Sequence, residues 1–303
     1  MRIILIGQAA FAEKVLDGAR ERGHDVAAVY CPPDAGGKTD PVKARALALG
    51  VPVRQHKSLK SPDVQREFSE LSADLGVLAY VTQIVPQNVF EVPRLGSICF
   101  HPSLLPRYRG GSAVNWQLIR GESETGVTVF WVDPGIDTGP ILLQKRAAVR
   151  PTDTAGSLYY DTLFPLGVEV VLESIGLVAS ARAPRVVQDE SDATYDPLCR
   201  DENVGSIDWS KPAREVYDLI RGCDPQPGAR TSLAGEVVRL YEPSLVDGAG
   251  VAAGVVAGVE TGLVIGAAGG AVRVKRVRVG DKKQGAAEFA AAHGVAPGTR
   301  LGS

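Results

Sequence analysis

Two loops rich in proline and glycine hold the residues of this sequence that are best suited to proton transfer. The first opens with His101, directly after the apolar run 97–100, and the second holds Asp137, shortly after the apolar run 130–132. Imidazole and carboxylate groups are common general acids and bases. Proline and glycine fix the backbone of such loops without regular structure, and functional residues are frequent there. His101 and Asp137 are therefore candidates for an acid–base pair.

Each of these residues also has a plainer interpretation. A lone histidine is more often a hydrogen-bonded structural residue, and the aspartate of an Asp-Thr-Gly sequence often caps its own turn. Asp133, in the same loop, is best explained as such a turn residue. His101, however, directly follows a predicted strand, and open α/β sheets keep their sites at the carboxyl ends of strands.

The elements that must position this pair alternate between strand and helix. Residues 2–6 and 26–30 are strand-like apolar runs, and residues 11–22 between them have a helical pattern. A strand, a helix and a strand within about thirty residues predict a βαβ unit and a parallel sheet. With further strands expected at residues 74–80, 97–101, 125–132 and 141–145, we predict an α/β domain. Its sheet is Rossmann-like and mostly parallel, with helices on both faces.

The turn after the first strand bears on the cofactor. It runs Gly-Gln-Ala-Ala-Phe from Gly7 and lacks the G-x-G-x-x-G pattern. That pattern brings the backbone close to a dinucleotide pyrophosphate. We therefore expect no NAD, despite the Rossmann-like opening.

The last third of the chain has a different pattern. Residues 180–203 are rich in proline and aspartate and predict a linker. Short valine-rich runs separated by glycine follow at 236–240, 254–259, 262–265 and 271–279, which is typical of an antiparallel barrel. We predict a catalytic domain over 1–203, including the linker at about 180–203, and a smaller barrel domain over 204–303.

Composition narrows the class of protein. The chain has 303 residues and a net charge of −2, so nothing global demands nucleic acid or a membrane partner. No apolar run reaches the length of about 18 residues that a membrane span needs, and we expect none. The four cysteines have no paired spacing, which argues against a zinc site or disulfides and for a reducing, cytoplasmic location.

The two loops together resemble the folate-dependent formyltransferase family. Its hallmark is a histidine followed by Ser-Leu-Leu-Pro and Arg-Gly, then an Asp-x-Gly-x-Asp-Thr-Gly loop. Residues 101–110 and 133–139 match both parts, and Ile-Asp-Trp from Ile207 resembles the family's carboxy-terminal domain. The resemblance implies an OB-like second domain. It also implies a one-carbon enzyme that transfers, or releases by hydrolysis, the formyl group of 10-formyltetrahydrofolate.

The resemblance further implies where the folate lies and which groups do the chemistry. His101 and Asp137 become the pair that handles protons while the formyl carbon is attacked, and no metal is implied. The loop after the strand at 74–80 holds the pterin in the family. The folate-binding positions carried over are Gln83, Ile84, Val85, Ser103, Leu104, Leu105 and Pro106, together with Asp137. Without the resemblance, Ile84 and Val85 would be interpreted as core residues.

Cys99 departs from the family pattern. Most members have asparagine two residues before the histidine, and its amide donates to the oxyanion, whereas a thiol is a weak donor. Loss of such a donor can cost about 3 kcal/mol. The hydrolase domain of 10-formyltetrahydrofolate dehydrogenase also lacks this asparagine, and residues 111–116, Gly-Ser-Ala-Val-Asn-Trp, resemble that branch. We therefore favour water as the formyl acceptor and keep a nucleophilic Cys99 as an alternative.

A basic stripe in the second domain favours another acceptor, initiator methionyl-tRNA. In an OB-like barrel such a stripe could follow an RNA backbone, and residues 282–301 resemble the end of the methionyl-tRNA formyltransferases. Residues 205–303 hold 12 basic and 10 acidic residues, however, and this small excess weakens the case. The stripe consists of Arg273, Lys275, Arg276, Arg278, Lys282 and Lys283.

Three other functions stay open. The acceptor could be a small amine such as an amino sugar. The chain could also be a folate-binding module that has lost catalysis with the asparagine, or mainly an RNA-binding protein. The last would show steep salt dependence of tRNA affinity and little need for folate.

Overall fold

The computed structural model describes residues 1–200, 204–247 and 250–302. Within them the chain forms two compact units. The first unit comprises residues 1–111, 126–147 and 161–195, and the second comprises residues 112–125, 148–160 and 196–303.

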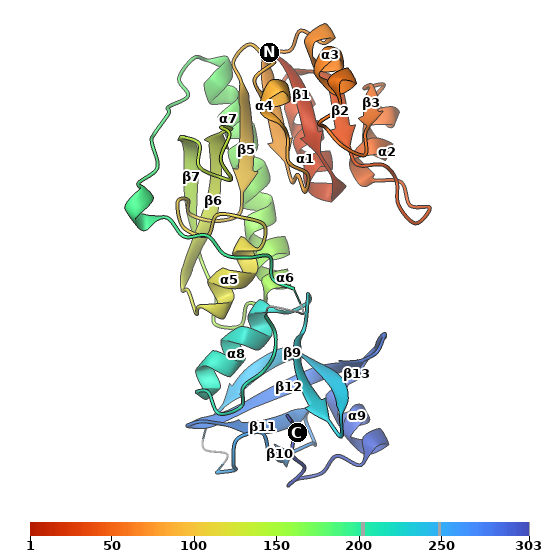
Figure 1. Cartoon of the computed structure of the whole chain (residues 1–303), viewed down its shortest axis with the longest axis vertical. Helices are drawn as coiled ribbons and strands as arrows, with labels where there is room; N and C mark the ends of the chain where they lie inside the picture. Colours follow the sequence, from red (N-terminus) through yellow and green to blue (C-terminus); the bar gives the residue numbers. More distant parts are fainter. Residues whose placement is uncertain (201–203, 248–249, 303) are drawn as a thin grey trace. The chain divides into compact units, whose positions relative to one another are not determined.

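A seven-stranded sheet forms the first unit (Figure 1), in the order β3-β2-β1-β4-β5-β6-β7. Strands β3, β2, β1, β4 and β5 run parallel to one another, whereas β6 runs antiparallel to β5 with Ile98 opposite Trp131. The predicted, mostly parallel sheet is confirmed. The strands are β1 (Arg2–Gly7), β2 (Asp25–Cys31), β3 (Val53–Gln55), β4 (Leu75–Ala79), β5 (Ser97–His101), β6 (Glu124–Trp131) and β7 (Ile141–Ala148).

Helices cover both faces of this sheet, as predicted. On one face α1 (Ala9–Glu21) packs against α2 (Pro41–Ala48) and α7 (Phe164–Ala179). On the other face α3 (Pro62–Glu70) and α4 (Gln87–Phe90) cover the side chains of alternate strand residues. Phe100 of β5 stacks on Phe11 of α1 at 4.4 Å between ring centroids, so it points to the α1 face. Because side chains alternate along a strand, Cys99 and His101 point to the α4 face.

One helical segment has an unusually apolar composition. Residues 155–179, which comprise α6 (Ala155–Ser157), a π-helical turn (Leu158–Leu163) and α7, are long and apolar enough to cross a membrane. Composition alone is weak evidence for a span, because core helices of globular proteins share it. Gly167 of α7 faces the Phe100 ring so closely that an added Cβ would lie 2.4 Å from its Cε2 atom. This stretch of α7 therefore packs on the sheet.

The second unit has an antiparallel sheet of its own, in the order β10-β11-β12-β9-β8, with β13 paired to β12. The predicted separate antiparallel domain is confirmed, and its OB-like character stays a prediction. Strand β8 and the last helix were not predicted, because neither has a clear periodic apolar pattern. The elements are α8 (Ala213–Gly222), β8 (Ala229–Leu233), β9 (Glu236–Val246), β10 (Val256–Gly258), β11 (Leu263–Ala267), β12 (Gly270–Val279), β13 (Lys282–Gly285) and α9 (Ala286–His293).

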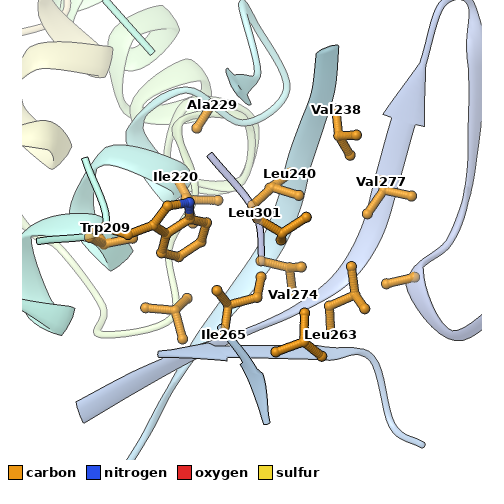
Figure 2. Packing of buried hydrophobic residues seen from close by; sticks show 14 of the residues in the cluster. Trp209, Ile220, Ala229, Val238, Leu240, Leu263, Ile265, Val274, Val277 and Leu301 are labelled. Carbon is orange, nitrogen blue, oxygen red and sulfur yellow. The ribbon is translucent and has the colours of Figure 1, made fainter. Parts of the chain in front are cut away.

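An apolar core fills the inside of this unit (Figure 2). Trp209 and Ile220 point toward strand residues such as Leu240, Val274 and Ile265, all 5% exposed or less. The Trp209 indole N–H donates to Thr231 Oγ1 at 3.0 Å, which satisfies its polar group inside the core. Burial on this scale is the main source of stability for a small domain.

A helix from the first half of the sequence also belongs to the second unit. In α5 (Ala113–Ile119), the Asn115 side-chain amide donates to the carbonyl of Gly222 at 2.7 Å. Gly222 lies so close to α5 that an added Cβ would be 2.5 Å from a carbon of Ile119. Residues 112–125 and 148–160 therefore belong to the same unit as the described residues of the last third of the chain, although we predicted them as part of the first domain.

Candidate active site

His101 ends β5 and is held on both sides of its ring. Its Nε2 atom lies 2.7 Å from the carbonyl oxygen of Tyr108, and its Nδ1 atom lies 3.4 Å from Oδ2 of Asp137. A carbonyl only accepts hydrogen bonds, so Nε2 must carry a hydrogen. The Nδ1 atom then faces a carboxylate, and a proton between the two groups satisfies both. The predicted pair is therefore in contact.

Asp137 does not cap its own turn. Its Oδ2 atom accepts from the backbone N–H of Gly110 at 2.8 Å in addition to facing His101. Within the described part of the chain, its Oδ1 atom has no hydrogen-bond partner. The turn is closed instead by Asp133, whose Oδ1 accepts from the N–H of Gly135 at 3.1 Å and the hydroxyl of Thr138 at 2.6 Å. The plainer interpretation thus holds for Asp133 and not for Asp137.

This arrangement can move a proton in either direction. A proton carried on Nδ1 of His101, beside the Asp137 carboxylate, could be donated to a developing oxyanion or to a leaving nitrogen. The partnerless Oδ1 of Asp137 can accept a hydrogen bond from an attacking water or amine. The His101 side chain is 7% exposed and that of Asp137 is 17% exposed, so little water competes for these bonds.

Cys99 sits beside the pair as a neutral thiol. Its Sγ atom donates to the carbonyl of Phe100 at 3.6 Å. Burial raises the pKa of Cys99 well above its ordinary value, and the nearby Asp137 carboxylate raises it further. The thiolate, not the thiol, is the nucleophile in cysteine chemistry. This environment argues against the nucleophilic alternative.

The Ser-Leu-Leu-Pro segment is mostly enclosed. Ser103 is fully buried, and its hydroxyl donates to the carbonyl of Arg107 at 2.7 Å. Leu105 is 3% exposed, and its carbonyl accepts from the side-chain amide of Gln144 at 3.0 Å. Ser103 and Leu105 shape the loop behind His101, whereas Leu104 and Pro106 are half-buried.

The three positions after β4 have different environments. Val85 is 8% exposed and belongs to the core beneath α3 and α4, whereas Ile84 is 70% exposed. Gln83 lines a small pocket, with a cavity volume of only about 20 Å³, at the carboxyl ends of β1, β2 and β4. Its side-chain Oε1 atom is buried without a hydrogen-bond partner among the described residues. A ligand with an N–H donor would satisfy that atom.

Sequence reasoning missed a segment that holds both loops. Residues 186–195, here called the strap, lie in the predicted linker but are bonded to the first unit. Gln188 donates to the carbonyls of Asp137 and Gly139, and Glu190 forms an ion pair with Arg109 at 2.6 Å. The available signal was Arg109, because an arginine in a loop dense with proline and glycine needs a carboxylate if it is buried.

The basic residues of the second unit are only partly aligned. Arg278 on β12 stands opposite Lys283 on β13 and, on its other side, opposite Arg239 on β9. Arg239 in turn stands opposite Arg230 on β8. Arg239 and Arg230 were not predicted. The other stripe residues do not join this row: Arg273, Lys275 and Arg276 lie earlier on β12, and Lys282 stands opposite Val279.

The row lies on the outer face of its sheet. Neighbouring residues along the same strands are buried in the core, and side chains alternate along a strand, so the four cations point away from the core. The buried neighbours are Ala229, Val238, Leu240 and Val277.

Comparison with known proteins gives a family for both parts of the chain. Residues 1–172 match the formyl transferase family, and residues 201–294 match the formyl transferase C-terminal domain. Mouse mitochondrial 10-formyltetrahydrofolate dehydrogenase is 41% identical over 251 residues, which cover 81% of this chain but only 27% of that protein. Methionyl-tRNA formyltransferase from Trichlorobacter lovleyi is 38% identical over 307 residues, which cover 99% of this chain and 96% of that protein.

Solved structures show the same fold. HypX from Aquifex aeolicus, in complex with tetrahydrofolic acid, superposes with a TM-score of 0.69 over 96% of this chain and 47% of its own, at 22% identity. A glycinamide ribonucleotide transformylase from Symbiobacterium toebii superposes with a TM-score of 0.55 at 26% identity, over 62% of this chain and 93% of its own. The chain spans about a quarter of the length of the dehydrogenases that it matches.

Proposed function

The chain belongs to the formyl transferase family, and from this premise we propose that it releases the formyl group of 10-formyltetrahydrofolate to water. The observation that carries the proposal is the contact between His101 Nδ1 and Asp137 Oδ2 at 3.4 Å, at the carboxyl end of β5. An acid–base pair at this edge of an α/β sheet is where such folds keep their chemistry.

The two side chains supply each proton transfer that hydrolysis needs. Oδ1 of Asp137 orients the water and accepts one of its protons as the water oxygen bonds to the formyl carbon. His101 donates the Nδ1 proton to the leaving folate nitrogen as the carbon–nitrogen bond breaks. The products are tetrahydrofolate and formic acid, which releases its proton to the solvent and leaves as formate. The proton gained by Asp137 returns to His101 across their contact, which resets the pair.

The folate side of the site rests on Gln83. A pterin ring carries N–H donors, and the buried, partnerless Oε1 of Gln83 is an acceptor that such a ring would satisfy. Tyr80 and Thr82 line the same cavity and would contribute an aromatic surface and a hydroxyl. Ile84, Ser103, Leu104, Leu105 and Pro106 stay predictions, and Ser103 and Leu105 are too enclosed to offer more than backbone contacts.

Water is favoured as the acceptor because of Cys99. A neutral thiol is a weak oxyanion donor, so the site lacks the amide that assists attack by an amine in most members of the resembled family. The relatives from 10-formyltetrahydrofolate dehydrogenase support the same choice.

The test follows both products in one experiment. The purified chain is mixed with 10-formyltetrahydrofolate, with and without charged initiator methionyl-tRNA, and free formate and formyl-methionyl-tRNA are measured. We expect formate without tRNA. His101→Ala and Asp137→Ala should each lower the rate by at least about 100-fold. His24→Ala and Asp17→Ala, at positions far along the chain from both loops, serve as matched controls and should release formate at the wild-type rate. If either His101→Ala or Asp137→Ala still released formate at the wild-type rate, the catalytic role proposed for that residue would be wrong.

Transfer to methionyl-tRNA is the second candidate, and the cationic row of Arg230, Arg239, Arg278 and Lys283 favours it. Like charges directly opposite each other on neighbouring strands destabilise a sheet, and a bound phosphate backbone would offset this repulsion. The relative from Trichlorobacter lovleyi is a methionyl-tRNA formyltransferase of matching length. Formylated tRNA in the experiment above would favour this candidate. Folate binding without either product would leave a small amine acceptor or a binding module.

A further inference from the structure

The strap ties the Asp137 loop to the His101 loop. At its start, Val186 exchanges two backbone hydrogen bonds with Ile141, at 2.8 and 3.0 Å, just after the Asp137 loop. Near its end, Thr194 Oγ1 accepts from the N–H of Tyr108 at 2.7 Å, and its carbonyl accepts from the N–H of Arg109 at 2.9 Å. The strap therefore bridges two loops that are far apart in sequence and carry the two reacting groups.

Gln188 is a strap residue whose side chain bonds to the backbone of Asp137. Its side-chain Nε2 donates to the carbonyl of Asp137 at 2.8 Å and to that of Gly139 at 2.7 Å. Its Oε1 accepts from Arg109 Nη2 at 2.8 Å and from Arg109 Nε at 3.2 Å. Gln188 is 5% exposed. The neighbours fix the amide orientation, because a flipped amide would place its oxygen against two carbonyls and its N–H groups against a guanidinium.

Arg109 closes a ring of contacts around Asp137. Its guanidinium is held by the Glu190 carboxylate through two bonds, at 2.6 and 2.9 Å. The next residue, Gly110, donates its N–H to the Asp137 carboxylate at 2.8 Å. Asp137 is therefore fixed at its carboxylate by Gly110 and at its own carbonyl by Gln188, with Arg109 linking the two contacts.

The backbone of Asp137 needs this support. Its φ angle is +56°, in the left-handed region that residues other than glycine seldom adopt. Such conformations persist where the surroundings determine them from several sides. Without the Gln188 bonds, the loop would relax and the carboxylate would move away from His101.

We propose that Gln188 is a positioning residue, which holds Asp137 in reach of His101 by binding the two carbonyls of its loop and Arg109 at once. The proposal rests on the proposed function of the His101–Asp137 pair. It adds that the strap, and not only the two loops, sets the geometry of the reaction.

The sharpest test exchanges the amide for a carboxylate of the same shape. In Gln188→Glu, a carboxylate oxygen faces the carbonyls of Asp137 and Gly139 and repels them, while the contact with Arg109 is kept. A misplacement of about 1 Å can cost about 100-fold in rate, so we expect a fall of that order in kcat. The affinity for 10-formyltetrahydrofolate should stay unchanged, because Gln188 acts on the chemical step and not on binding.

Two further variants separate positioning from general damage. Gln188→Asn keeps an amide but is one methylene too short to reach both sides, and it should also lose most of the rate if Gln188→Glu does not fold. Gln117→Glu is the matched control, since Gln117 is a buried glutamine of the second unit, 2% exposed, whose Nε2 donates to Ala113. It should lower the melting temperature and leave kcat unchanged.

A double variant tests whether Gln188 acts through Asp137. Gln188→Glu combined with Asp137→Asn should be no slower than Asp137→Asn alone, because the group to be positioned is already absent. Additive rate reductions would overturn the proposal, as would a folded Gln188→Glu or Gln188→Asn variant with wild-type kcat.

A readout without turnover separates this proposal from the proposed function. The imidazole ¹⁵N resonances of His101 report the proton at Nδ1, whether or not formate is produced. If the wild-type chain releases no formyl group, the proposed function fails. The positioning proposal then stands if Gln188→Glu shifts these resonances and Gln117→Glu does not, and it falls if neither variant shifts them.

Discussion

At position 99 the chain has a thiol where an amide would serve an oxyanion better. Cys99→Asn should raise the rate of formyl transfer to an amine by up to about 100-fold, because a well-placed amide donor contributes about 3 kcal/mol to such a reaction. The measurement is transfer to a simple amine or to methionyl-tRNA, compared with formate release. Cys199→Asn, at a half-buried cysteine of the second unit, is the control. Complete loss of activity in Cys99→Asn would instead favour a nucleophilic thiol.

The charge of Asp137 can be tested apart from its shape. Asn tolerates the left-handed backbone of this position, and its side-chain oxygen can still accept from Gly110. Asp137→Asn should therefore fold normally while the rate of formyl release falls by at least about 100-fold, since an amide cannot accept the proton of the attacking water. Equal melting temperatures with unequal rates would bear this out. A rate near that of the wild type would show that the carboxylate is not needed as a base.

At the scale of elements, the strands and helices that could be predicted from the sequence are those with periodic apolar residues. Strands such as β1 and β5 and the helix α1 are close to their predicted ranges, because their buried residues repeat at the spacing of a strand or a helix. The His101–Asp137 pair was predicted from motifs. The strap was not, because its role lies in side-chain bonds of Gln188 and Glu190 to distant loops, which no local pattern records. Likewise, the alignment of Arg230 and Arg239 with the basic stripe depends on strand register.

A buried carboxylate in the second unit gives a prediction about pH. Burial raises the pKa of Asp224 above its ordinary value of 3.8. Its Oδ2 accepts from the N–H of Glu242 at 2.9 Å. Since the folded state holds this proton more tightly, its contribution to stability is full below pH 3.8 and is lost as the pH rises through the raised pKa. The asparagine side chain in the Asp224→Asn variant does not titrate. This variant should therefore become more stable relative to the wild type as the pH rises through the raised pKa of Asp224.

Thermal melting from about pH 3.5 to pH 7 measures this effect. The control is Asp208→Asn, because hydrogen bonds from Ser210 lower the pKa of the exposed Asp208. A lowered folded pKa stabilises the protein above the ordinary pKa, so this variant should lose stability relative to wild type as the pH rises. The same pH trend in both variants would contradict the assignment of burial as the cause.

At the scale of the whole molecule, the proposed function and its alternative rest on different units. The first unit contains the His101–Asp137 pair, the strap and the pocket beside Gln83, on which the proposed release of the formyl group rests. The second unit contains the cationic row on the outer face of its sheet. The net charge of −2 for the whole chain conceals this local concentration of positive charge. If the chain binds RNA, its affinity should therefore depend on the few residues of the cationic row and not on the net charge of the chain.

Reversing the central charge of the row should change stability and RNA binding in opposite directions. Arg239→Glu places a carboxylate between Arg230 and Arg278, and replacing like-charge pairs by opposite ones should stabilise the sheet by about 0.2–1 kcal/mol per pair. If the row binds a phosphate backbone, tRNA affinity should fall, and its dependence on salt should weaken by about one unit of logarithmic slope for each phosphate that the row no longer neutralises. Arg66→Glu, at an exposed arginine of α3 in the first unit, makes the same change in net charge. It should neither stabilise the protein nor lower its affinity for tRNA. Greater stability without any change in tRNA affinity would mean that the row is a solvated surface, and the tRNA candidate would lose the observation that favours it.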